Sequence, residues 1–152
     1  MKIGRILVPH DGEQMSDKAL MYAAEFAKAF GAEIILCHVV EQIEVPATLL
    51  LGNDKELIAR AKRTLIKEVE NSWNRFAQEK IKLFSSEKLQ ISAGLKTGDP
   101  AEQILKFAQE KDADLIVMGS RRLGGASKFI MALGSVARKV SERSQCPVML
   151  IH

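Results

Sequence analysis

Hydrophobic positions along the chain follow two recurring patterns. Short apolar runs with little polar alternation occur at residues 2–9, 32–40, 113–119 and 147–152, as expected for strands buried on both faces of a parallel sheet. Between them, apolar residues spaced by three or four predict helices at 16–30, at 57–80, from 100 onward and at 135–144. Residues 89–95 alternate apolar and polar side chains, which predicts a half-exposed strand at a sheet edge.

Five strands that alternate with four helices favour an α/β fold with one parallel, doubly wound sheet. The helix ends carry local signals. Ser16 is the expected cap of the first helix and Gly31 its end, while Asp99, with Pro100 after it, is the expected cap of the third. Residues 41–53 have no clear period and are interpreted as a long loop.

Composition narrows the class of protein. The chain has 152 residues, 47% of them hydrophobic, which suits one domain over residues 1–152. Its net charge of +3 is too small to indicate nucleic acid or a membrane surface as a partner. Two cysteines make a poor disulfide framework, and the N-terminus resembles neither a signal peptide nor a spanning helix. We therefore expect a cytoplasmic protein that does not contact membranes.

A glycine-rich, basic segment follows the fourth predicted strand. Between Gly119 and Arg143 there are six basic residues and one acidic residue, a local charge of +5. Glycines let backbone amides approach a phosphate closely, and a helix that starts at Ser135 adds unpaired amides. The alternative is an ordinary turn with a solvated basic face. The position favours a ligand, because open α/β sheets bind ligands where strands end, and the first strand ends similarly at "VPHDG".

Several segments together resemble the universal stress protein family: "RILVPHDG", "LCHVVE", "GDPAEQIL", "DADLIVMGSR" and "LGSVARKVSERSQCPVMLI". The resemblance covers nearly the whole chain and is weakest from 42 to 94. It implies a Rossmann-like sheet of strand order 3-2-1-4-5 with helices on both faces. It also implies a homodimer through the last strand, residues 147–152, and, in one branch of the family, bound ATP.

The glycine motif of that branch is only partly kept. Nine residues separate Gly124 from Gly134, and Ser135 follows, as in the family pattern. The first spacing differs, because four residues instead of two lie between Gly119 and Gly124, and Arg122 stands where the shorter spacing expects glycine. An arginine there could replace a lost amide with a charge-assisted hydrogen bond.

The resemblance also implies a set of site residues. Asp11 would face the ribose or a magnesium ion that accompanies the phosphates, and Val39 would hold the adenine through its backbone. His10 stands where the family commonly has threonine and is expected to be exposed without a partner. Asp11 could instead only cap a helix or a turn, and His38 is expected to be structural. The residues implied for the nucleotide are Pro9, His10, Asp11, Val39, Met118, Gly119, Arg121, Arg122, Gly124, Gly134, Ser135 and Val136.

Other chemistries find little support in the sequence. It has no Gly-Lys-Ser or Gly-Lys-Thr phosphate loop, no zinc-ligand spacing and no nucleophile that can be placed beside a base, so no catalytic residue is assigned. With one Trp and one Tyr, the chain lacks the aromatic residues of a nucleic-acid stacking platform, so a nucleic-acid partner is not expected.

The leading hypothesis is a stress-response regulatory or sensor module that binds ATP, ADP or AMP. The alternatives are a slow ATPase or phosphoryl-transfer protein and a structural dimer without nucleotide.

Overall fold

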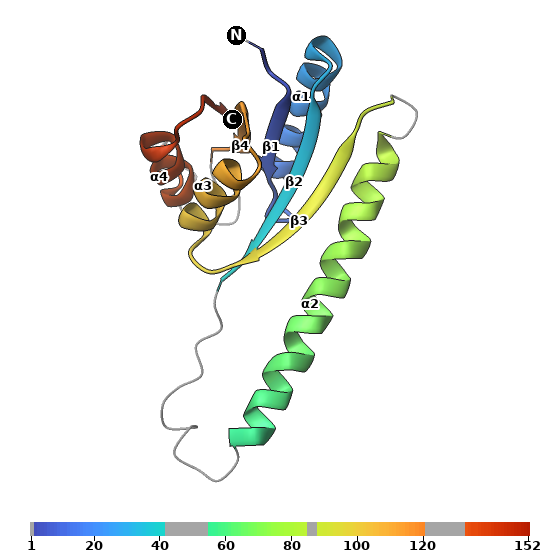
Figure 1. Ribbon diagram of the computed structural model, residues 1–152, viewed down its shortest axis with the longest axis vertical. Coiled ribbons are helices and arrows are strands. Elements are labelled where there is room, and N and C mark those ends of the chain that lie inside the picture. Colours follow the sequence, from blue (N-terminus) through green and yellow to red (C-terminus); the bar gives the residue numbers. More distant parts are fainter. Residues whose placement is uncertain (1, 42–54, 85–87, 121–132) are drawn as a thin grey trace.

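The fold is built around one parallel sheet. The computed structural model describes residues 2–41, 55–84, 88–120 and 133–152. The sheet has five strands in the order β3-β2-β1-β4-β5, which confirms the expected topology (Figure 1). The elements are β1 Arg5–Pro9, α1 Gln14–Phe30, β2 Glu33–Val40, α2 Lys55–Leu83, β3 Ile91–Thr97, α3 Pro100–Glu110, β4 Leu115–Gly119, α4 Ser135–Arg143 and β5 Val148–Ile151.

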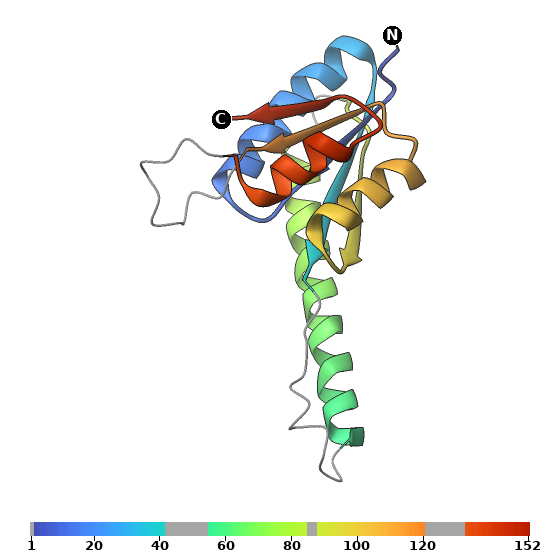
Figure 2. The ribbon, with the colours of Figure 1, turned by 90° about the vertical axis from the view of Figure 1, so that its left-hand side faces the viewer.

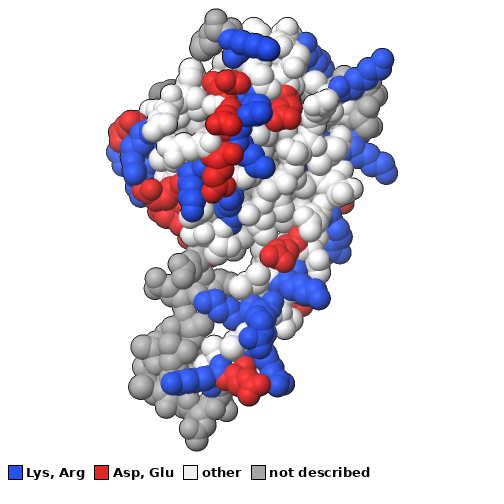
Figure 3. Space-filling model, in the orientation of Figure 1, with Lys and Arg blue, Asp and Glu red and all other residues white. Residues whose placement is uncertain are grey.

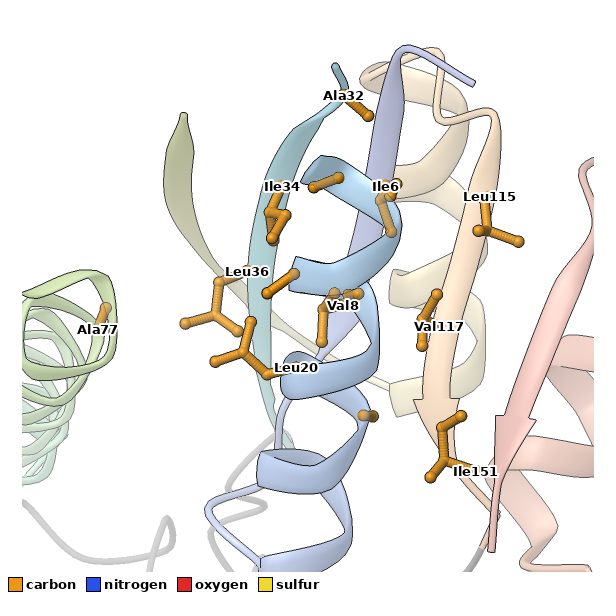
Figure 4. Close-up of a cluster of buried hydrophobic side chains, with 14 of the residues drawn as sticks. Ile6, Val8, Leu20, Ala32, Ile34, Leu36, Ala77, Leu115, Val117 and Ile151 are labelled. Atoms are coloured by element: carbon orange, nitrogen blue, oxygen red, sulfur yellow. The ribbon is translucent and has the colours of Figure 1, made fainter. Parts of the chain in front are cut away.

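Each face of the sheet has its own hydrophobic core. Successive side chains of a strand point to opposite faces, so Ile6 and Val8 pack under α1 and α2 while Leu7 packs under α3 and α4. All three are fully buried. Figure 4 shows the first core, where the side chain of Leu20 on α1 lies next to that of Leu36 on β2. Burial on both faces explains why these strands read as uninterrupted apolar runs.

The strand order creates an opening at the carboxyl ends of β1 and β4. The chain leaves β1 toward β2 on one side and reaches β4 on the other, so the two loops diverge at this switch point. β3 and β5 form the two edges of the sheet, as Figure 2 shows for β5 beside β4. The edge position and partial exposure of β3 confirm the interpretation of its alternating pattern.

Two of the three expected helix-end signals are confirmed. Gly31 adopts a left-handed conformation, φ 67°, and ends α1, while Asp99 caps α3 by accepting the amide of Glu102 at 3.0 Å. That hydrogen bond lowers the pKa of Asp99. The prediction for Ser16 was wrong, because α1 starts at Gln14 and Ser16 lies within its first turn.

α2 is much longer than the sheet that it covers. Only Trp73 and Ala77 are buried along its 29 residues, and Figures 1 and 2 both show its first half projecting beyond the sheet. The basic side chains Lys62, Arg63 and Lys67 belong to this half, where blue atoms dominate the surface in Figure 3. Among the helices that the structure describes, none combines the length and the hydropathy needed to cross a membrane. The loop expected at 41–53 lies almost wholly outside the described residues.

Candidate functional site

A cavity of about 340 Å³ lies at the carboxyl ends of β1 and β4. This volume is within the range of roughly 300–1,000 Å³ that is typical of small-molecule sites. The loop after β1, the end of β2 and the first turns of α3 and α4 form its walls. Its lining residues are Pro9, His10, Asp11, Ser16, Cys37, His38, Val39, Glu41, Pro100, Ile104, Met118, Gly119, Ser120, Gly134, Ser135, Val136 and Ala137.

Nine of the twelve residues that were predicted from the sequence to contact a nucleotide line this cavity. The other three, Arg121, Arg122 and Gly124, lie outside the described residues. The structure also adds residues that sequence reasoning did not place at the site. Glu41 directly follows β2 and is a second acidic residue in the lining, in addition to Asp11, and Pro100 and Ile104 of α3 and Ser120 after β4 also line the cavity. Their position at strand ends and in a capped first turn was the available signal.

Asp11 is held in a defined orientation by its own loop. Its Oδ1 accepts hydrogen bonds from the amide of Glu13 at 3.0 Å and from the hydroxyl of Ser16 at 2.7 Å. The turn-capping role considered for Asp11 is therefore present, and it places the carboxylate at the cavity wall. Ser16, which lies inside the first turn of α1 and so cannot cap it, uses its hydroxyl to hold Asp11 instead.

His10 is buried, with 2% of its surface exposed, so the prediction that it is exposed without a partner was wrong. Its Nδ1 accepts the amide of Gly12 at 3.0 Å, which leaves the proton on Nε2 to be donated to Asp17 at 3.0 Å. Lys80 of α2 forms an ion pair with the same Asp17 oxygen. Burial lowers the pKa of His10, although the hydrogen bond to Asp17 opposes this shift. His10 thus links the loop after β1 to both α1 and α2.

His38 and Cys37 have structural surroundings. The Nδ1 of His38 donates to the carbonyl of His10 at 2.7 Å, and its ring stacks on Trp73 of α2 with ring centroids 5.1 Å apart. Burial raises the pKa of the Cys37 thiol to about 12, which keeps it protonated and therefore a poor nucleophile. The expectation that His38 is structural agrees with these contacts.

The backbone of Val39 faces the cavity side of β2. Cys37, two residues earlier, accepts the amide of His10 with its carbonyl, and Val40 accepts the amide of Gly98 on the β3 side. Backbone groups of a strand alternate in direction, so the N–H and C=O of Val39 point toward β1. β1 has already ended there, since Pro9 pairs with Cys37. Val39 therefore offers one donor and one acceptor beside the cavity.

The starts of α3 and α4 differ in whether a side chain caps their opening amides. The amides that open α3 are capped by the carboxylate of Asp99. α4 begins after Gly134, which has no side chain to cap it, and its first residues, Ser135, Val136 and Ala137, line the cavity. Unpaired amides and the helix dipole make such a start favourable for an anion. Between the starts of α3 and α4, that of α4 is the one available to a negatively charged ligand.

Part of the basic charge predicted near the site is neutralised by α3. Lys139 of α4 lies 3.7 Å from Asp99, and Arg143 pairs with Glu102. The pKa of Arg143 is raised by its hydrogen bond with Glu102. Figure 3 shows blue and red side chains interleaved where α3 and α4 lie. These two cations tie the helices together and are not directed at the cavity.

Gly119 has a packing role in addition to its place at the cavity. A Cβ added there would lie 3.0 Å from the Cβ of Met15 and 3.3 Å from its carbonyl carbon. A side chain at this position would therefore require the start of α1 and the end of β4 to move apart by a few tenths of an ångström. This contact sets the distance between the loop after β1 and the exit of β4.

Comparison with known proteins decides the family. The universal stress protein family model matches residues 2–152. The chain belongs to the universal stress protein family. A curated family member, universal stress protein YxiE of Bacillus subtilis, is 35% identical over 155 residues, covering 97% of this chain and 98% of its own.

Solved structures of the family share the fold. The universal stress protein from Archaeoglobus fulgidus in complex with dAMP has a TM-score of 0.63 and 25% sequence identity, and the match covers 100% of both chains. A universal stress protein in complex with cAMP has a TM-score of 0.71 and 22% identity, covering 100% of this chain and 99% of that one. Both of these relatives carry an adenine nucleotide on a similar fold.

Proposed function

We propose that this universal stress protein binds an adenine nucleotide in the cavity between β1 and β4 and acts as a nucleotide-responsive regulatory module. The proposal rests on one observation: nine of the residues predicted to contact a nucleotide line a single cavity, and the uncapped start of α4 forms part of its wall. The dAMP complex of the Archaeoglobus fulgidus relative supports the ligand class.

In this proposal the phosphates lie against the first turn of α4. Ser135, Val136 and Ala137 supply backbone donors there, and Ser135 adds a hydroxyl. Gly134 allows a phosphate oxygen to approach the helix start without meeting a side chain. Arg121, Arg122 and Gly124 remain proposed phosphate contacts on the grounds of the sequence alone.

The nucleoside would occupy the opposite wall. The outward N–H and C=O of Val39 provide the donor and acceptor that a planar base edge can match, while Ile104 and Met118 supply apolar surface. Pro9 and His10 complete the wall beneath the ribose, and Asp11 faces the ribose hydroxyls. Fixed by Ser16 and Glu13, the Asp11 carboxylate needs little further ordering to act as an acceptor.

Magnesium would enter with the nucleotide. Within the described ranges, no three His, Cys, Asp or Glu side chains are grouped to hold a metal ion. The cavity does contain two carboxylates, Asp11 and Glu41, and carboxylate oxygens suit magnesium when substrate phosphates supply further ligands. Asp11 is the proposed protein contact of a magnesium nucleotide.

Calorimetric titration of the purified protein with ATP, ADP, AMP and adenosine, with and without magnesium, tests this function. Mass spectrometry of the supernatant after denaturation identifies any nucleotide that copurifies. We expect saturable binding of adenine nucleotides and its loss in Gly134→Val, with Gly4→Ala as a folded control far from the cavity. Absence of binding to the parent at millimolar nucleotide would refute the proposal.

We also propose a homodimer through residues 147–152. β5 is an edge strand of the sheet, and three of its four residues are only partly buried in the isolated chain. An apolar edge with unpaired backbone groups favours pairing with another strand. Light scattering at micromolar concentration should give twice the monomer mass.

A further inference from the structure

The hydroxyl of Ser120 is an unsatisfied polar group in the wall of the cavity. Ser120 has 1% of its surface exposed, and its Oγ has no hydrogen-bond partner within the part of the chain that the structure describes. Its backbone is fully engaged, because its amide donates to Ile151 at 2.8 Å and its carbonyl accepts the amide of Gly134 at 2.8 Å. A buried hydroxyl without a partner is costly, and such groups in native proteins usually indicate a missing ligand or a functional role.

Ser120 is placed next to the start of α4 by the strand that precedes it. Met118 belongs to the core beneath α3 and α4, whereas Gly119 faces Met15 of α1. Continued alternation turns the side chain of Ser120 to the same face as Met118. On that face the cavity is lined by Gly134 and by the opening turn of α4. The hydroxyl and the uncapped helix start are thus two independent groups of donors that converge on one region.

We propose that Ser120 is a phosphate-binding residue, whose hydroxyl donates a hydrogen bond to the phosphate held at the first turn of α4. This inference rests on the proposed nucleotide function and adds a residue to it. A phosphate oxygen accepts several donors, so one oxygen can satisfy the Ser120 hydroxyl together with a backbone amide of α4. The bond to Gly134 fixes Ser120 relative to the helix start before any ligand arrives, which reduces the ordering required on binding.

Ser120→Ala tests the proposal because binding and stability should change in opposite directions. Removing an unsatisfied buried hydroxyl should leave the melting temperature of the ligand-free protein unchanged or raise it. Affinity for AMP should fall roughly 10- to 100-fold, as expected for a hydrogen bond to a charged group, while affinity for adenosine stays constant. Ser141→Ala is the matched control, since that serine lies on α4 outside the cavity lining, is exposed and donates its hydroxyl to the carbonyl of Arg138.

Three results would overturn the role of Ser120: unchanged AMP affinity in Ser120→Ala, equal losses for AMP and adenosine, or a clear drop in the melting temperature of the ligand-free variant. The first two leave the proposed nucleotide function intact. If the parent binds neither AMP nor adenosine, that function fails, and thermal melts with inorganic pyrophosphate decide the anion site separately. Protection of the parent but not of Ser120→Ala would sustain the Ser120 site, and equal protection of both, or of neither, would refute it.

Discussion

Gly119→Ala should destabilise the protein even though its backbone conformation suits any residue. Gly119 is not among the glycines with positive φ, so alanine gains about 0.4–1 kcal/mol by restricting the unfolded chain. Against this gain stands a Cβ placed 3.0 Å from the Met15 Cβ, 3.3 Å from its carbonyl carbon and 3.4 Å from its oxygen. Overpacking of this kind typically costs 1–3 kcal/mol, so we expect a net loss of about 1–2 kcal/mol. For a chain of this size that corresponds to a fall in melting temperature of roughly 2–8 °C.

The control for this substitution is Gly4→Ala, where the nearest atom to an added Cβ, an oxygen of Asp114, lies at an ordinary 3.5 Å. It should melt at or slightly above the parent temperature. Trimming Met15 to alanine cannot relieve the contact, because the Cβ and the backbone atoms remain. The cost of Gly119→Ala should therefore be the same, within about 0.5 kcal/mol, in the parent and in Met15→Ala. A Gly119→Ala variant as stable as the parent, or one rescued by Met15→Ala, would show that the close approach of α1 to β4 is wrong.

Three further outcomes follow from the same structure. Gly94→Ala should be destabilising because its Cβ would lie 2.6 Å from the Phe107 ring, and unfolding in urea should show this cost removed in a Phe107→Leu background. Burial lowers the pKa of His10 from 6.5, so in acid the unfolded state binds a proton that the folded state does not. The free energy of unfolding should therefore fall as the pH drops below about 6.5. Urea titrations at about pH 5–8 should show a weaker dependence on pH in His10→Gln. Val148→Pro removes an amide that points away from β4, so light scattering should show monomers with little change in melting temperature. Met149→Pro removes an amide that points toward β4 and should disrupt the pairing of β5 with β4. A dimeric Val148→Pro variant would contradict pairing through this strand.

The strands were predictable because burial on both sheet faces leaves a direct mark on the sequence, whereas their order was implied by the resemblance to the family. Leu115 to Met118 form an uninterrupted apolar run for the same reason that all four are at least 94% buried in the fold. The edge strand β3 was also recognisable, since polar residues are interspersed in a strand that is partly exposed along its whole length. The spacing of apolar residues along a strand or helix thus indicates how many of its faces are packed against other elements.

The errors at Ser16 and His10 have a different origin. Asp11 and Ser16 are both good helix caps when each is considered alone, and the structure satisfies them by bonding one to the other. His10 has polar neighbours in sequence, but its ring is buried against Phe76 of α2, and its partner Asp17 is held by Lys80 of the same helix. Contacts between residues more than 60 positions apart leave no periodic signal, so burial could not be read from the adjacent residues.

The starts of α3 and α4, which both line the cavity, show how far the chemistry of the site can be predicted from the sequence. "DPAE" before α3 places a carboxylate on the opening amides, whereas "GSVA" at α4 leaves the amides without a side-chain cap. That difference in capping alone indicates which helix start can accept an anion. The role of Ser120 could not be predicted in this way, because its hydroxyl is seen to lack a partner only once β4, β5 and α4 have been placed around it. Local capping therefore indicates which helix start can receive an anion, and tertiary packing adds the hydroxyl that we propose distinguishes a phosphate from the nucleoside that carries it.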